Sequence, residues 1–129
     1  MIKYLTCDQV VEIHDEMIKK FGGLPGLRDW NLLSTIEAPK WSFAGQEVYP
    51  TLFEKAAVYL YHIVKNHSFN DANKRTAYLV TLIFLEANEA PIVFNPKDLE
   101  EVVVFTAQGK MEKDEISLFL ETGKLSKRN

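Results

Sequence analysis

Hydrophobic residues recur at helical spacing along most of the chain and are separated by short polar, glycine- or proline-containing stretches. Thr6 and Gln9 form a capping box, and the apolar positions that follow it continue as far as the glycine pair at 22–23. This pattern predicts a first helix of about four turns. Asp29 is placed to cap a second, short helix, which Pro39 ends.

Two strongly apolar segments occupy the middle of the chain. The first follows another capping box, Thr51 with Glu54, and is apolar on nearly every side, as expected of a helix buried inside a bundle. The second begins at Asn73 and continues to Asn88. The polar stretch 67–72 between them predicts a short loop that joins two central helices.

The stretch 39–50, before the first central helix, has the composition of a loop or hairpin. It holds Pro39 and Pro50 with glycine and several aromatic residues between them, among them Trp41 and Phe43. A passive linker does not need so many aromatic side chains. We therefore treat 39–50 as a candidate flap.

The last third of the chain predicts a short extended piece at 92–94 and two further helices. Asn95 followed by Pro96 is typical of a helix start, and Gly109 can close that helix. The final helix contains the apolar positions within 116–120, and the polar tail 124–129 is expected to fray. The sequence thus predicts an all-α fold, a compact six-helix bundle formed by one domain over residues 1–129.

Composition and charge restrict the classes of function. The chain has 129 residues, of which 47% are hydrophobic and 26% charged, which is ordinary for a globular protein. Its net charge of −3 removes the usual electrostatic case for sequence-independent nucleic-acid binding, and we expect no direct contact with nucleic acid. The single cysteine, Cys7, forms no internal disulfide, and no membrane-length apolar run is present. These features predict a cytoplasmic protein that does not bind a membrane.

The segment 67–75 concentrates chemically reactive groups at a helix start. Lys74 and Arg75 lie in the first helical turn, where the helix dipole is positive, so they cost energy unless an anion compensates them. A helix N-terminus also attracts phosphate. We therefore predict a phosphate site here, and we expect that replacing either cation by alanine leaves stability nearly unchanged.

Three neighbouring residues complete this hypothesis. Asp71 offers a hard oxygen ligand for the Mg²⁺ that accompanies a nucleotide triphosphate. His67 can take a proton from a hydroxyl group as that group attacks phosphorus. Phe69 is apolar between polar neighbours, so we expect it to anchor the loop in the core.

This segment resembles the signature loop of the Fic/Doc family, and in particular its Doc (death-on-curing toxin) branch. Ala72 and Lys74 stand where the Fic branch has glycines, and the lysine is the Doc-like feature. The turn at 22–26 and the order of six helices are also Doc-like, so the resemblance covers essentially the whole chain. The matching residues of the loop are His67, Phe69, Asp71, Ala72, Asn73, Lys74 and Arg75.

The resemblance implies a role for each residue of the loop. His67 would activate the target hydroxyl, Asp71 would hold Mg²⁺ on the nucleotide, and Asn73, Lys74 and Arg75 would bind its phosphates. It implies the toxin of a type II toxin–antitoxin module that uses ATP to phosphorylate a threonine of translation elongation factor Tu and so arrests translation. Two alternatives stay open: a Fic-type adenylyltransferase, and a non-catalytic module that binds an antitoxin or a target.

The family also has an extended flap that aligns the target, and the aromatic stretch with Trp41 and Phe43 is the matching candidate. Fic relatives often carry an inhibitory helix, but Thr122 breaks that pattern here, so restraint is expected from a separate antitoxin. His14, beside Asp15 and similar to a pair in the first helix of Doc, is interpreted as a core histidine bonded to a carboxylate or carbonyl. His62 is also interpreted as structural.

Overall fold

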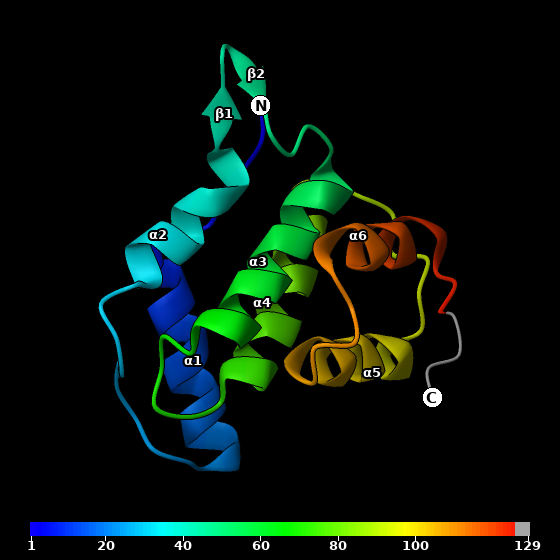
Figure 1. The fold of residues 1–129 in the computed structure, drawn as a ribbon. Coiled ribbons are helices and arrows are strands. Elements are labelled where there is room, and N and C mark those ends of the chain that lie inside the picture. The colour runs from blue at the N-terminus through cyan, green and yellow to red at the C-terminus, as the bar shows by residue number, and fades with distance from the viewer. Residues whose placement is uncertain (126–129) are drawn as a thin grey trace.

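The structure, a computed structural model, describes residues 1–125 as a bundle of helices with one small hairpin (Figure 1). Positions 126–129 of the predicted polar tail lie outside the described residues. The helices are α1 (Cys7–Phe21), α2 (Leu32–Glu37), the short 3-10 helix η1 (Ala38–Lys40), α3 (Leu52–Asn66), α4 (Asn73–Ala87), α5 (Pro96–Ala107) and α6 (Lys113–Thr122). The predicted all-α fold with six α-helices is confirmed within the described part of the chain.

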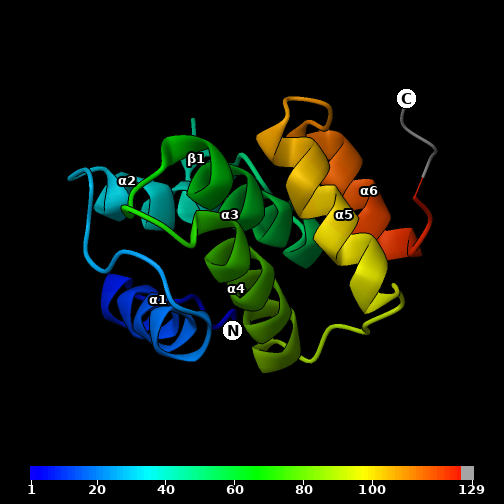
Figure 2. The ribbon, with the colours of Figure 1, turned by 90° about the horizontal axis from the view of Figure 1, so that it is seen from below.

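The two central helices, α3 and α4, pack side by side and carry the core. α1 and α2 lie on one side of this pair and α5 and α6 on the other, as two views at right angles show (Figures 1 and 2). Tyr59 and Leu60 of α3 are fully buried, as are Phe84 and Leu85 of α4. The nearly all-round apolar pattern of the first central segment therefore reflects contacts on several faces.

The helix starts agree with the predicted capping residues at three places. Thr6 and Thr51 form complete capping boxes, in which each threonine side chain accepts a hydrogen bond from the backbone N–H three residues later. Asn95 caps α5 without a capping box: its side-chain oxygen accepts a hydrogen bond from the N–H of Lys97, two residues later, and Pro96 lies in the first turn. Local sequence signals were sufficient here because the groups they satisfy lie within one turn.

The prediction for the second helix was wrong in its start. α2 begins at Leu32, so Asp29 does not cap it. The backbone N–H groups of Arg28 and Asp29 instead donate to the carbonyl of Ser68, at 2.8 and 3.3 Å, which keeps this part of the chain out of the helix. A tertiary contact with the loop thus delays the start of the helix by two residues, because Asn31 and not Asp29 stands at the N-cap.

The stretch 39–50 contains the predicted hairpin. β1 (Ser42–Phe43) pairs antiparallel with β2 (Gln46–Glu47), with Phe43 opposite Gln46. The hairpin lies at the N-terminal end of α3, whereas the loop 67–72 lies at its C-terminal end (Figure 1). A 15-residue helix is about 22 Å long, so the two features are separated by the length of α3. Within residues 1–125, no helix is both long enough and apolar enough to cross a membrane.

Candidate functional site

The loop 67–72 joins α3 to α4 and is bounded by two residues in the left-handed conformation. His67 follows α3 with a φ of 47°, and Ala72 precedes α4 with a φ of 62°. Residues other than glycine adopt this conformation at a cost of about 1–2 kcal/mol each. Such strain is concentrated at functional sites, where the surrounding structure holds it in place.

A cavity of about 460 Å³ opens at this loop and at the first turn of α4. It brings together the five residues for which the sequence predicts a chemical role: His67 and Asp71 of the loop, and Asn73, Lys74 and Arg75 of the first turn of α4. Trp41 and Phe43 do not line it. The lining residues are Val64, His67, Asn70, Asp71, Ala72, Asn73, Lys74, Arg75 and Ala107.

The start of α4 presents unused donors to this cavity. The first N–H groups of a helix have no carbonyl one turn earlier, and Ala72 at the N-cap has no polar side chain to accept a hydrogen bond from them. Lys74 is exposed and makes no hydrogen bond or ion pair with any residue between 1 and 125. Backbone dipoles and a free ammonium group together suit an anion such as a phosphate.

Asp71 is the acidic group of the site. Its Oδ1 accepts a hydrogen bond from the Ala72 N–H at 2.8 Å, and its Oδ2 accepts one from the Leu24 N–H at 3.3 Å. These two bonds, helped by the positive charge of Arg75, lower the pKa of the carboxyl below its usual value. Each oxygen keeps a further lone pair, and the side chain is open to solvent.

Asp71 cannot form a metal cage with other side chains of this region. Residues 1–125 contain no group of three or more His, Cys, Asp or Glu side chains that could hold a metal ion. Mg²⁺ is often bound by one or two carboxylates together with water and substrate phosphates. The single carboxylate beside an anion site therefore fits Mg²⁺ that arrives with a nucleotide.

The turn after α1 packs against the carboxylate of Asp71. Gly23 has a φ of +123°, and a Cβ atom there would lie 2.7 Å from Oδ2 of Asp71, so only glycine fits without displacement. Beyond it, residues 24–29 run beside the loop: Asn70 donates its backbone N–H to the Gly26 carbonyl at 3.0 Å, and Leu27 forms a β-bridge with Phe69. The sequence signal was the glycine-rich turn at 22–26, but its contact partner was not visible in it.

Two residues of the loop fix its conformation from within. Phe69 is 1% exposed and lies in the core, where an anchoring role would place it. The side-chain amide of Asn73 bonds the Phe69 backbone twice, as acceptor at 3.2 Å and as donor at 3.0 Å. Asn73 can therefore meet a phosphate through its backbone N–H, while its side chain holds the loop closed.

Arg75 has contacts that the sequence did not indicate. Its guanidinium donates to the carbonyls of Met17 and Gly22, at 3.5 and 3.3 Å, and lies over the ring of Phe21. These carbonyls belong to the C-terminal end of α1, where the helix dipole favours a cation. Arg75 thus supports the fold as well as facing the cavity, which revises the expectation that its loss leaves stability unchanged.

The candidate flap residues lie away from this cavity. Trp41 packs edge-on against His62, with ring centroids 5.9 Å apart, and Phe43 is 80% exposed near the end of the hairpin. His62 is half-buried, and burial together with nearby Lys113 lowers its pKa. A docking role for Trp41 and Phe43 stays a prediction, and it requires a target that extends along α3.

Comparison with known proteins settles the family. Residues 4–85 match the model of the Fic/DOC family. The chain belongs to that family. Its relatives include "Protein kinase doc" of Escherichia phage P1, which is 32% identical over 116 residues, 90% of this chain and 91% of the relative. Another, "Toxin Doc" of Mycolicibacterium smegmatis (strain ATCC 700084 / mc(2)155), is 39% identical over 69 residues, 53% of each chain.

Proposed function

We propose that this Fic/DOC protein is the toxin of a type II toxin–antitoxin module and acts as an ATP-dependent protein kinase on a threonine of elongation factor Tu. The observation that carries the proposal is the single cavity shared by His67, Asp71, Asn73, Lys74 and Arg75. The names of the two relatives, a protein kinase and a toxin, support the same reading. Arrest of translation is the expected effect on the cell.

The residues around the cavity suit phosphoryl transfer. ATP with Mg²⁺ supplies the γ-phosphoryl group. His67 accepts the proton of the target hydroxyl as its oxygen attacks phosphorus, since its imidazole lines the cavity and imidazole is the most frequent general base in enzymes. Lys74, Arg75 and the N–H groups of the first turn of α4 would hold the phosphate oxygens, and Asp71 would hold the Mg²⁺ that neutralises part of their charge. The bond to the leaving ADP breaks as the new P–O bond forms.

Adenylyl transfer is the second candidate, and one residue separates the two. The Fic branch has glycine where this chain has Lys74, an exposed cation that lines the cavity. A lysine there adds positive charge close to the backbone and changes which phosphate can be placed opposite His67. This difference favours transfer of the γ-phosphate, and Lys74→Gly is expected to shift any remaining activity toward AMP transfer.

Labelled ATP distinguishes the candidates directly. The protein is incubated with elongation factor Tu and Mg²⁺, and with ATP labelled at either the α or the γ phosphate. Transfer of the γ-label supports the kinase, transfer of the α-label supports an adenylyltransferase, and transfer of neither supports a binding module without turnover. His67→Ala is the control, because an exposed residue can be replaced without loss of the fold.

The antitoxin is expected to bind an apolar groove beside the cavity. This groove, of about 560 Å³, is lined by apolar residues of α1, α4 and α5, among them Phe21, Leu79 and Val104, and it shares Lys74 and Arg75 with the catalytic cavity. An amphipathic helix that fills it would cover the phosphate site. The free protein is then active and the complex silent.

Val104→Asp tests this arrangement, because Val104 is exposed and lines the groove. The variant should lose antitoxin binding and keep transfer activity. Leu118→Asp on α6, also exposed and outside the groove, is the matched control. Full transfer activity in a saturated complex with the antitoxin would contradict the proposed mode of inhibition.

The target segment has two candidate docking places. The hairpin is one, and the edge formed by residues 24–30 is the other, which is favoured because it runs beside the loop through the Leu27–Phe69 bridge. Trp30 on this edge is 94% exposed. A higher KM for the target in Trp30→Ala but not in Phe43→Ala would assign docking to the edge, and the reverse result would assign it to the hairpin.

A further inference from the structure

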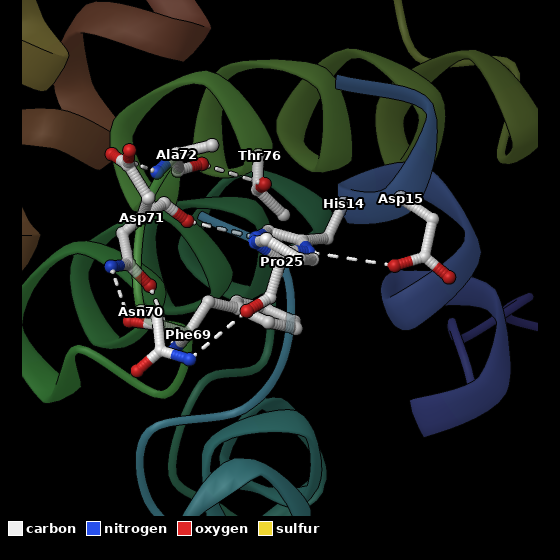
Figure 3. Close-up of polar contacts among 9 residues, drawn as sticks. His14, Asp15, Pro25, Phe69, Asn70, Asp71, Ala72 and Thr76 are labelled. Atoms are coloured by element: carbon white, nitrogen blue, oxygen red, sulfur yellow. Dashed lines mark hydrogen bonds and ion pairs between the residues drawn. The ribbon is translucent and has the colours of Figure 1, made fainter. Parts of the chain in front are cut away.

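His14 of α1 contacts the signature loop although it is 53 residues away from His67 in the chain. Its side chain is fully buried, and its Nε2 lies 2.8 Å from the carbonyl oxygen of Asp71 (Figure 3). Its ring stacks on Phe69, with centroids 3.8 Å apart and planes inclined by 8°. One side chain thus contacts both the anchor of the loop and the peptide that carries the acidic group.

The chemistry of these contacts defines the state of the ring. A carbonyl oxygen only accepts hydrogen bonds, so Nε2 must carry the proton that it donates to Asp71. Nδ1 is buried without a hydrogen-bond partner, and the carboxylate of Asp15 lies 3.7 Å from it, beyond hydrogen-bond distance. The Nε2–H therefore makes the only hydrogen bond of this ring among residues 1–125.

Both the side chain and the backbone carbonyl of Asp71 are hydrogen-bonded when His14 is counted. The carboxylate is fixed by the N–H groups of Ala72 and Leu24, and the carbonyl by His14. The next carbonyl, that of Ala72, accepts from the Thr76 hydroxyl at 2.7 Å and begins α4. Without the His14 donor, the Asp71 carbonyl would be left facing a buried ring, and rotation of this peptide would carry the carboxylate away from the cavity.

We propose that His14 is a positioning residue: its Nε2–H, bonded to the Asp71 carbonyl, sets the direction in which the Asp71 carboxylate meets the divalent cation of the nucleotide. The effect of His14 on catalysis rests on the proposed function, whereas its hydrogen bond to the Asp71 carbonyl does not. His14 does not line the cavity, so it touches neither substrate nor metal.

Two substitutions separate the hydrogen bond from the filling of the core. His14→Gln keeps an N–H donor at about the position of Nε2, whereas His14→Asn is one bond too short to reach the Asp71 carbonyl. Both remove the ring that stacks on Phe69. His14→Phe does the opposite, because it keeps the stacked ring and removes the donor. His62→Phe is the control, since it also replaces a histidine with an unpartnered buried nitrogen, but at a site outside the loop.

The first measurement needs neither nucleotide nor target. Hydrogen exchange of the Ala72 amide, which donates to Asp71 Oδ1, is followed by NMR and compared with core amides such as that of Leu60. Loss of one hydrogen bond to the loop should speed exchange of Ala72 relative to the core by about fivefold to tenfold in His14→Asn and His14→Phe. His14→Gln and His62→Phe should leave this ratio within about twofold of wild type.

The second measurement is the Mg²⁺ concentration that gives half the maximal rate of γ-phosphate transfer. We expect it to rise by about fivefold to tenfold in His14→Asn and His14→Phe, with the rate at saturating Mg²⁺ much less affected, and to stay near wild type in His14→Gln. The proposal would be overturned if His14→Gln and His14→Asn raised this Mg²⁺ concentration equally, or if His14→Phe left it unchanged. His14 would then be a core residue only. If wild-type protein transfers no phosphate, the proposed function fails, and the exchange comparison still decides whether His14 positions Asp71.

Discussion

At the N-terminal end of α3, Lys55 is fully buried and its ammonium group pairs with Glu47 at 2.8 Å and bonds the carbonyl of Tyr49. Beyond the other end of the same helix, Lys74 is exposed and has no partner among residues 1–125. The first lysine ties the hairpin to the bundle. The second faces a cavity at the start of α4, where a cation is unfavourable for the helix itself.

The two lysines illustrate different reasons for placing a charge: Lys55 is paired within the fold, whereas Lys74 is available to a ligand. A buried ammonium persists only if it is paired and hydrogen-bonded, and the candidate flap 39–50 supplies both partners, Glu47 of β2 and the carbonyl of Tyr49 that follows it. A cation left unpaired at a helix N-terminus lowers stability and is retained where a ligand compensates it. The four expected outcomes below test whether the two ends of α3 are independent in this way.

The largest effect is expected at the loop. His67→Ala should reduce γ-phosphate transfer by about 10²- to 10⁴-fold, the usual loss when a general base is removed. Its thermal melting temperature should stay near wild type because His67 is exposed and ends α3 without packing in the core. Equal growth arrest by wild type and His67→Ala on expression would show that His67 is not the base.

A substitution at the hairpin end of α3 should change the free energy of unfolding but not nucleotide binding. Lys55→Met removes a charged hydrogen-bond donor from a buried position and should lower the free energy of unfolding by about 2 kcal/mol, measured by urea denaturation. Lys40→Met is the control, since Lys40 pairs with Glu37 on the surface and should cost less than about 0.5 kcal/mol. A loss of nucleotide binding in Lys55→Met would mean that the two ends are coupled.

Within the cavity, Lys74 and Arg75 should both contribute to ATP binding, but only Arg75 should contribute to the stability of the free protein. Lys74→Ala is expected to weaken ATP binding by about tenfold and leave the melting temperature of the free protein unchanged or slightly raised. Arg75→Ala should weaken binding and also lower stability by about 1 kcal/mol, because it loses its bonds to the end of α1. Arg75→Lys should also weaken binding, since an ammonium lacks the two-pronged geometry of guanidinium. Thermal melts with and without ATP–Mg²⁺ measure both effects.

The smallest effect concerns pH. The pKa of Asp71 is lowered in the folded protein by the N–H groups of Ala72 and Leu24, so the unfolded chain binds this proton more readily. Its ionised form therefore contributes stability above the ordinary aspartate range, near pH 3.9, and this contribution is lost as the pH falls through the lowered value. Asp71→Asn should be less stable than wild type at pH 7, and the difference should shrink toward pH 3 in denaturation experiments. A constant difference would assign the effect to packing.

Much of the fold was predictable because its signals are local. Capping boxes at Thr6 and Thr51, the Asn95–Pro96 start and the glycine pair after α1 each act within one turn of the helix they bound. The failure at Asp29 has the opposite cause, since the Ser68 carbonyl that holds this segment lies about forty positions away in the chain. Lys55 was missed for a related reason: an apolar helix pattern gives no sign of a buried charge whose partners come from another element.

The sequence by itself determined the helices, the family resemblance and the residues of the loop, because these depend on periodicity, caps and a contiguous motif of nine positions. Only the tertiary structure decided which distant groups support them. Residues 24–29 lie beside the loop, and Arg75 donates a hydrogen bond to the Gly22 carbonyl at the end of α1. His14 contacts the carbonyl of Asp71. Helix periodicity specifies which face of each helix is buried, but the partner of a buried polar atom depends on how the helices pack, and a single sequence does not encode that locally.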